Sequence, residues 1–324
     1  DYVTLAAVIE EIAAGDGATT ALNGEAAIAV GRLATTAAAR SIALGDRANA
    51  GNLNVQDTIA IGTTAAVTGD FSLKGIAIGH AATVSAVDAV ALGAGTVASG
   101  AGAAAVGANS VAGGAESVAI GRATATGARA LAAGSGATVA TADSIALGTG
   151  AGVGTASNAA GDRTSHIAIG TGAGTGVIGN QTTAIGFEAG TGVDGDQNIA
   201  IGTQAGNAAE GDYNVALGYQ ANSAASLRDR TVAIGGLATA ATDATSLGYG
   251  AKAEGVASVS IGSQSSASES GVALGRNARA EKETVALGFN STALASDALG
   301  SAYLTGDVAP SSVVSVGNTV AGQT

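Results

Sequence analysis

Residues 117–127 read Ser-Val-Ala-Ile-Gly-Arg-Ala-Thr-Ala-Thr-Gly. The motif at the start of this stretch, aliphatic–small–aliphatic–Gly, recurs 20 times along the 324 residues, the first copy ending at Gly31 and the last two at Gly300 and Gly317. Successive motif glycines keep a nearly regular spacing, as from Gly31 to Gly45, and the residue two before each glycine is always Ala or Ser. A repeat this strict decides the fold before any other feature of the sequence.

A period of about 14 residues is too short for a helical-hairpin repeat, and it suits one coil of a β-solenoid with two short strands and two turns. The large–small–large alternation has the two-residue period of a strand. A glycine without Cβ can then turn the chain at positive φ, and a second strand of small residues follows, as in 123–127. We therefore predict an all-β fold, a parallel β-roll or β-solenoid of about 20 short coils.

The two faces of the motif predict where its side chains go. An unbroken stack of Ala and Ser implies that another backbone lies close, so we assign these residues to the inside of a narrow roll and the aliphatic residues to the outside. An aliphatic stripe of this length exceeds what a monomer surface tolerates, and we expect three chains to share one axis lined by it. The predicted trimer core comprises Ile61, Ile78, Ile120, Ile169, Ile201 and Ile234. The opposite assignment, with aliphatic residues inside and alanines between chains, stays open.

The composition of the chain excludes several classes of binding partner and site. The chain has a net charge of −12, which disfavours binding to nucleic acid, heparin or anionic membranes, because all three need clustered Lys and Arg. It has no Cys, and so no disulfide, thiolate metal site or cysteine nucleophile. No apolar run is long enough to form a membrane-spanning helix, so we expect no membrane insertion by this segment.

The stretch 117–127 and the motif Ser144-Ile145-Ala146-Leu147-Gly148 resemble the YadA-like head of trimeric autotransporter adhesins. The resemblance covers about residues 24–317. It implies a left-handed parallel β-roll, a homotrimer, and a non-enzymatic role in cell adhesion at the bacterial cell surface. The implied partners are copies of the chain itself and a host surface protein or glycan. The adhesive residues of the family share no motif, so none can be transferred to this chain.

A second resemblance competes with the first. From His166 to Asn222 the coils become longer, as the motif glycines Gly170, Gly186 and Gly202 show, and they read Ala-Ile-Gly-x-x-Ala-Gly-x-Gly. This pattern is similar to repeats in phage tail fibres and spikes, which implies a virion fibre that binds a host surface as the alternative.

The ends of the chain depart from the repeat. Tyr2, Leu5, Ile9 and Ile12 have the a/d spacing of a helical seam, and Gly15 offers a helix stop. We expect 1–23 to form a short N-terminal helix and connector, either the end of a coiled coil or a cap on the roll. The predicted roll spans 24–317, and 318–324 would begin a neck or tail. A start at Asp1 and a chain without Met lead us to expect a processed protein or a piece of a longer one.

Four rings follow directly after motif glycines and are candidate surface contacts or turn covers: Phe187, Tyr219, Tyr249 and Phe289. Recurrent Gly-Asp pairs could hold calcium, but Asp in a turn more often bonds backbone N–H groups, which we favour. The histidines His80 and His166 are expected in solvated turns. No catalytic constellation, metal site or cofactor site is predicted, and we expect no enzyme activity.

Overall fold

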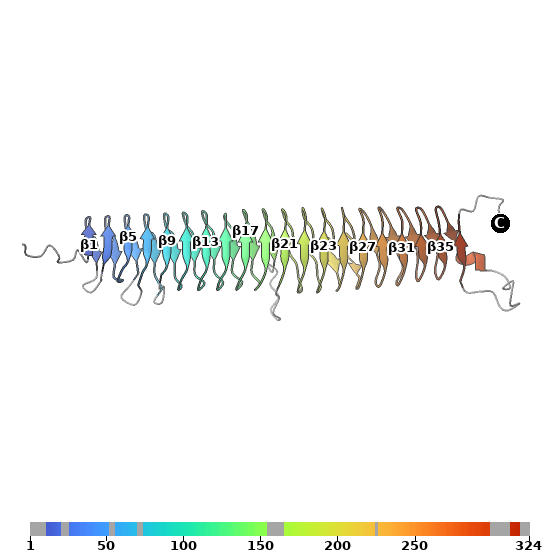
Figure 1. The fold of residues 1–324 in the computed structure, drawn as a ribbon, viewed down its shortest axis with the longest axis horizontal. Coiled ribbons are helices and arrows are strands. Elements are labelled where there is room, and N and C mark those ends of the chain that lie inside the picture. Colours follow the sequence, from blue (N-terminus) through green and yellow to red (C-terminus); the bar gives the residue numbers. More distant parts are fainter. Residues whose placement is uncertain are drawn as a thin grey trace, which may run out of the picture. The chain divides into compact units, whose positions relative to one another are not determined.

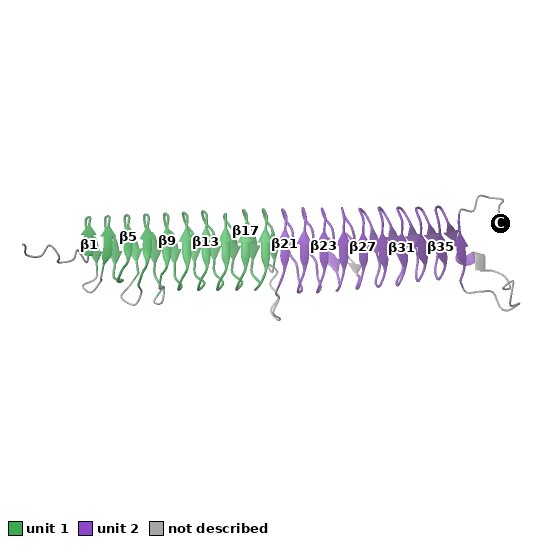
Figure 2. Ribbon diagram, viewed as in Figure 1, with its two compact units in different colours: residues 1–153 green, residues 154–324 purple. Residues whose placement is uncertain are grey.

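The computed structural model describes residues 11–20, 26–51, 56–69, 74–153, 165–223, 226–298 and 312–317. Two compact units divide the chain, Asp1–Val153 and Gly154–Thr324 (Figure 2). Within each unit the chain winds through repeated coils, most of which have a strand of three or four residues, a turn, a strand of two residues and a second turn (Figure 1). Each unit is thus an all-β parallel solenoid, which confirms this part of the fold prediction.

In unit 1 the longer strands form the long sheet and the two-residue strands form the short sheet. The long-sheet strands are β1 (Glu11–Ala14), β3 (Ala27–Val30), β5 (Ile42–Leu44), β7 (Ile59–Ile61), β9 (Ile76–Ile78), β11 (Val90–Leu92), β13 (Ala104–Val106), β15 (Val118–Ile120), β17 (Leu131–Ala133) and β19 (Ile145–Leu147). The 10-stranded short sheet comprises β2 (Thr19–Thr20), β4 (Thr35–Thr36), β6 (Asn49–Ala50), β8 (Ala66–Val67), β10 (Thr83–Val84), β12 (Val97–Ala98), β14 (Val111–Ala112), β16 (Thr124–Ala125), β18 (Thr138–Val139) and β20 (Gly152–Val153).

Unit 2 repeats this arrangement with an interrupted short sheet. Its long-sheet strands are β21 (Ile167–Ile169), β22 (Thr183–Ile185), β23 (Ile199–Ile201), β25 (Val215–Leu217), β27 (Val232–Ile234), β29 (Thr245–Leu247), β31 (Val259–Ile261), β33 (Val272–Leu274), β35 (Val285–Leu287) and β37 (Val314–Val316). The short strands form one pair, β24 (Ala209–Glu210) with β26 (Ser226–Leu227), and a five-stranded sheet of β28 (Thr239–Ala240), β30 (Lys252–Ala253), β32 (Ser266–Ala267), β34 (Arg279–Ala280) and β36 (Thr292–Ala293).

Alanine fills the interior of both units. Equivalent positions stack in parallel register, so that Ala60 pairs with Ala77 and Ala119 with Ala132. These alanines are fully buried, whereas the aliphatic residues on either side of them are half-buried or exposed. The interior is therefore narrow and lined by small residues, as predicted, and the opposite assignment of the two faces is wrong.

A second interior stack lies one position before each long strand and is largely polar. Within it the Thr58 hydroxyl donates to Ser41 Oγ at 2.8 Å or to the Ala50 carbonyl at 3.0 Å. These bonds satisfy polar groups that would otherwise destabilise the interior. His166 occupies the same stack, 1% exposed, and its Nδ1 accepts the Thr182 N–H at 3.3 Å. The prediction of a solvated turn for this histidine is wrong, because its imidazole is buried inside the roll and accepts a backbone hydrogen bond from the next coil.

The N-terminal segment differs from the prediction. Glu11–Ala14 is strand β1, which pairs in parallel with β3, and Asp1–Glu10 lie outside the described residues. The helical prediction is therefore wrong for the described part of 1–14. Ile12-Ala13-Ala14-Gly15 is in fact a further copy of the motif, and its pairing with the next coil outweighs the a/d spacing of an isolated helix, which is marginal at this length.

The C-terminal motif copy ending at Gly300 is not a coil of the long sheet. Strand β35 pairs directly with β37, and Ala295–Ala298 forms the 3₁₀ helix η1, the single helical turn among the described residues. The copy begins with Asp297, where the other copies place a large aliphatic residue or, in three cases, Ala104, Thr183 and Thr245. A charged residue is a poor occupant of the aliphatic position, so the chain bypasses this copy before it returns to the sheet.

Candidate interaction surfaces

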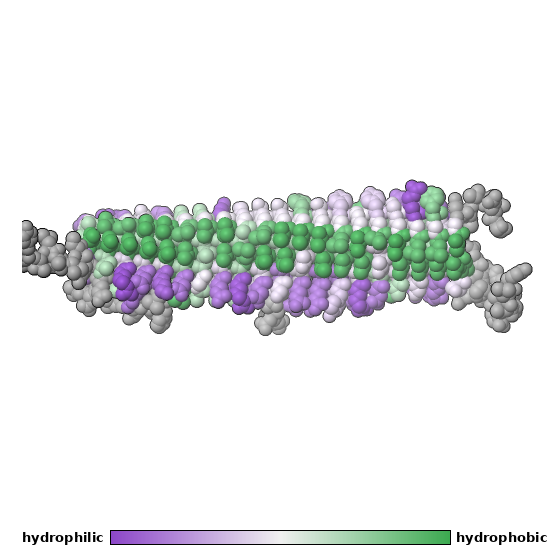
Figure 3. All heavy atoms as spheres, in the orientation of Figure 1, coloured by the Kyte–Doolittle hydropathy of each residue, from purple (hydrophilic) through white to green (hydrophobic). Residues whose placement is uncertain are grey.

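An aliphatic strip runs over the long sheet of each unit. We define it as the side chains at the two positions that flank the buried Ala or Ser of each long strand, as in Ile76-Ala77-Ile78, and it is visible in green in Figure 3. Ile78 is 37% exposed and Ile120 is 43% exposed. The register places each such residue directly on its equivalent in the next coil. The strip is therefore continuous within a unit, unlike the scattered apolar residues of ordinary surfaces.

All six isoleucines predicted for a trimer core lie on this strip. Each stands at the last position of its long strand, immediately before the motif glycine. Ile61 and Ile78 are direct neighbours, and Leu217 lies between Ile201 and Ile234. Because they point out of the roll, the isoleucines of each unit are accessible to a second chain.

Ion pairs join successive coils at the turn that precedes the long strand. Arg40 Nε donates to Asp57 Oδ1 at 2.7 Å, and equivalent pairs link Arg129 to Asp143 and Arg230 to Asp243. The hydrogen bond from Arg40 lowers the pKa of Asp57 below its ordinary value, and the partner arginines do the same to the pKa of Asp143 and of Asp243. All these groups are exposed, so each pair contributes little to stability by itself.

The four candidate rings are exposed at the opposite turn, one residue after the motif glycine. Phe187, Tyr219, Tyr249 and Phe289 are between 47% and 58% exposed. The structure does not gather them into one cluster, because coils with Gly236, Ser263 and Arg276 at the same position separate the last three. Arg276 lies over the Phe289 ring at 4.4 Å from its centroid, so this ring is partly covered by a cation.

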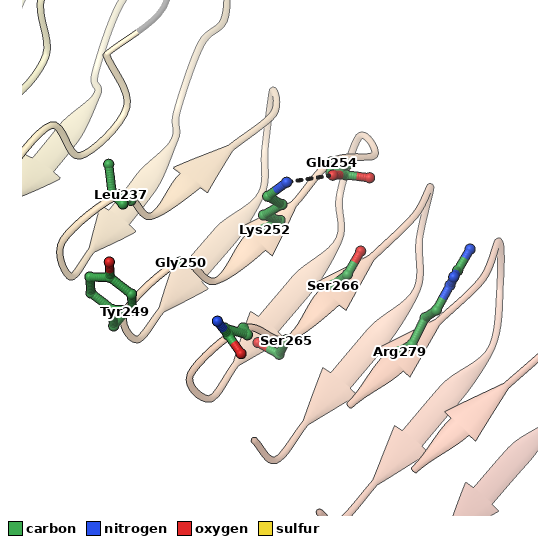
Figure 4. Close-up of a pocket in the computed structure, with 9 residues that line it drawn as sticks. Leu237, Tyr249, Gly250, Lys252, Glu254, Ser265, Ser266 and Arg279 are labelled. Atoms are coloured by element: carbon green, nitrogen blue, oxygen red, sulfur yellow. Dashed lines mark ion pairs between the residues drawn. The ribbon is translucent and has the colours of Figure 1, made fainter. Parts of the chain in front are cut away.

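Tyr249 differs from the other three rings because it borders a hollow on the short sheet of unit 2. The hollow has a volume of about 630 Å³ and is lined in part by Lys252, Gln264, Ser266 and Arg279 (Figure 4). No motif in the sequence singles out these polar residues. Counting four residues on from Gly248, Gly262 and Gly275 finds Lys252, Ser266 and Arg279, which the register then confirms as one row.

Two Gly-Asp pairs of unit 2, those of Asp196 and Asp212, accept hydrogen bonds from backbone groups of an adjacent coil. Asp196 Oδ1 accepts the Asn180 N–H at 2.8 Å, and Asp212 Oδ1 accepts the Asp196 N–H at 2.7 Å. These carboxylates thus act as turn acceptors. Within the described ranges, no group of three or more His, Cys, Asp or Glu side chains is arranged to hold a metal ion.

Six segments of the chain are similar to a known repeat. The model of the YadA head domain repeat (2 copies) matches residues 23–48, 56–73, 74–96, 98–124, 125–151 and 240–265, a little under half of the chain. Together with the parallel β-solenoid, these matches confirm the resemblance to a YadA-like head β-roll. YadA heads are structural domains of surface adhesin fibres and not enzymes. A search of curated proteins found no match, and no helix among the described residues is long and apolar enough to cross a membrane.

Proposed function

We propose that the chain is the head of a trimeric bacterial surface adhesin, in which three copies pack through the aliphatic strip. The observation that carries this proposal is the strip itself, because a single chain leaves its stacked Ile, Leu and Val side chains partly exposed. Burial of such side chains stabilises a complex by roughly 25 cal/mol for each Å² removed from water. Matching residues repeat at every coil, so identical strips on three parallel chains can pack in register.

The adhesive mechanism follows from the division between fixed and variable positions. The interior position at the centre of each long strand holds Ala or Ser coil after coil, while the turn positions change from Arg to Asp, Phe, Tyr and Gln. A fibre of this kind presents many different side chains on a rigid scaffold. Three copies side by side raise the effective concentration of each contact, so that weak single contacts combine into firm attachment. The expected partner is a host surface protein or glycan, and no reaction is involved.

The trimer is tested with two single-site variants of one coil. Ile120 is 43% exposed in one chain, so Ile120→Asp alters an isolated roll little but places an unpaired charge in the trimer core. Thr124→Asp adds the same charge on the short sheet of that coil. We expect light scattering at micromolar concentration to give trimers for the wild type and for Thr124→Asp, and monomers or unfolded protein for Ile120→Asp. A monomeric wild type would refute the packing.

Adhesion is tested with beads coated with either variant at equal density. We expect the Thr124→Asp trimer to hold host extracellular matrix and the Ile120→Asp protein to release it under flow. Equal retention by both would contradict the multivalent mechanism.

A phage tail fibre is the second candidate. It is favoured by one observation, that residues 152–239 lie outside the matched YadA head segments and include the longer coils. Retention on bacterial envelopes in place of host matrix in the same bead assay would support the virion fibre.

A further inference from the structure

The short sheet of unit 2 carries a row of side chains unlike any other in the described part of the chain. Parallel register places Thr239, Lys252, Ser266, Arg279 and Thr292 at equivalent positions of five adjacent strands. Two cations thus flank one short hydroxyl residue. Adjacent strands are about 4.8 Å apart, so the stems of Lys252 and Arg279 are separated by about 10 Å. The small side chain of Ser266 between them leaves the hollow seen in Figure 4.

The charges around this hollow are incompletely paired. Arg279 is exposed, and its guanidinium has no ion pair or hydrogen bond among the described residues. The nearby carboxylate of Glu281 accepts the Ala295 N–H at 3.0 Å. Lys252 Nζ lies 3.9 Å from Glu254 Oε1, a loose contact. The hollow is therefore lined by two cations and one carboxylate, and the Glu281 carboxylate, which accepts the Ala295 N–H, is not among its lining residues.

We propose that this hollow binds an acidic saccharide with widely spaced carboxylates, such as a uronic or sialic acid glycan. Arg279 would pair with a carboxylate in a fork geometry, and Lys252 would attract a second acidic group two strands away. The Tyr249 ring at the rim offers an apolar face to a sugar ring, and Gln264 and Ser266 offer hydrogen bonds to sugar hydroxyls. The inference deepens the proposed adhesive function by naming the ligand class, and rests on it only for the biological setting.

The same geometry disfavours other acidic partners. Strand β32 is paired on both sides, by β30 and by β34, so an acidic peptide finds no free strand edge to extend. Two cations beside one carboxylate also form too sparse a patch for a densely sulfated polymer or a nucleic acid, which need clustered basic residues. A saccharide with one acid group for every second sugar suits two cations separated by one strand.

The test measures binding of the full chain to short glycans by calorimetry. The probes are a hyaluronan hexasaccharide and disialyllactose, which each carry more than one carboxylate; each is compared with its neutral methyl ester, and together they distinguish uronic from sialic acid. We expect one acidic probe to bind and its ester to bind about tenfold more weakly. Arg279→Gln and Tyr249→Ala should each weaken binding by about three- to tenfold, and raising the ionic strength from about 0.05 M to about 0.3 M should weaken it further.

Two further variants distinguish specific binding in the hollow from nonspecific electrostatic attraction to surface cations. Arg122→Gln removes an exposed cation from unit 1 and should leave the affinity unchanged. Ser266→Arg adds a positive charge but fills the hollow, so it should abolish binding while circular dichroism confirms the fold. Tighter binding by Ser266→Arg, or equal weakening by Arg122→Gln and Arg279→Gln, would overturn the proposal. So would the absence of binding to both acidic probes. These measurements do not depend on the trimer, so their failure is distinct from a failure of the light-scattering test.

Discussion

The α-carbon of Gly45 lies against the carbonyl of Gly62 in the next coil, so closely that a Cβ on Gly45 would stand 2.6 Å from that oxygen. Gly45 also has a φ of +136°, a backbone conformation that residues other than glycine rarely adopt. The stack of motif glycines thus serves both the turn and the close approach of coils.

Gly45→Ala should therefore destabilise the roll by at least about 3 kcal/mol. The new methyl group would clash with the backbone of the next coil, and alanine would also be held at an unfavourable φ. Gly121→Ala is the matched control, since its φ is +72° and no atom lies within 4 Å of its added Cβ. We expect the control to lose about 1–2 kcal/mol, for the left-handed conformation alone. Thermal unfolding of the two variants measures the difference. Equal melting temperatures would show that the close approach of Gly45 to Gly62 costs nothing to relieve.

Ala119→Leu tests the narrow interior. Ala119 is fully buried and stacks between Ala105 and Ala132, so three additional carbon atoms have no room and should cost about 1–3 kcal/mol or more. Ile120→Leu, one residue later on the exposed strip, conserves volume and should change the free energy of unfolding little. Urea titration of both variants provides the comparison. Wild-type stability for Ala119→Leu would mean that the interior can expand.

The repeat made most of this architecture predictable. Small residues at one strand position and aliphatic ones on each side indicated which face lies inside, and the burial of Ala60, Ala77 and Ala119 agrees. The errors arose at irregular copies. Ile12-Ala13-Ala14-Gly15 has Ala14 in place of the second large aliphatic residue, and the a/d spacing of residues 2–12 predicted a helix there instead of a strand. The copy ending at Gly300 has the expected glycine spacing, so it was predicted to be a coil although it begins with Asp297.

The candidate binding hollow was not predicted, because its residues do not form a recognisable sequence motif. Lys252, Ser266 and Arg279 lie in three successive coils and far apart in the sequence, and only the stacking of coils brings them into one row. Of the four candidate rings, sequence could not distinguish Tyr249 from Phe289, because their neighbours in the adjacent coils decide their surroundings. Phe289 lies beneath Arg276, and Tyr249 borders the hollow.

The ion pairs between coils predict how stability depends on pH. Asp57, Asp143 and Asp243 each have a pKa lowered below 3.8 by an arginine in an adjacent coil. A lowered pKa in the folded state stabilises the protein above the ordinary pKa, and this contribution is lost as the pH falls through the folded value. The triple variant Asp57→Asn, Asp143→Asn, Asp243→Asn should therefore melt below the wild type at pH 6, and the gap should close in strong acid.

Asp88→Asn is the control for this series, because Asp88 occupies the same turn position and forms no ion pair among the described residues. A gap between wild type and triple variant that persists unchanged into strong acid would show that the asparagines act through packing rather than charge.

Variants of the aspartate turns in unit 2 can show whether these carboxylates serve as hydrogen-bond acceptors or as calcium ligands. Asp212 Oδ1 accepts the Asp196 N–H at 2.7 Å, and the Asp212 N–H donates to Asp229 Oδ1 at 2.9 Å. An asparagine keeps an acceptor oxygen at this position and removes one of three stacked negative charges, so Asp212→Asn should be as stable as the wild type or slightly more so. Asp212→Ala leaves the Asp196 N–H without its partner and should lose about 0.5–1.5 kcal/mol of stability.

Melting temperatures measured in EDTA and in excess calcium distinguish the two roles of the carboxylates. We expect the wild type and the two variants to rank in the same order of melting temperature in both solutions, with no shift on adding calcium. A calcium-dependent rise in the wild type that Asp212→Asn abolishes would instead identify the carboxylates as metal ligands.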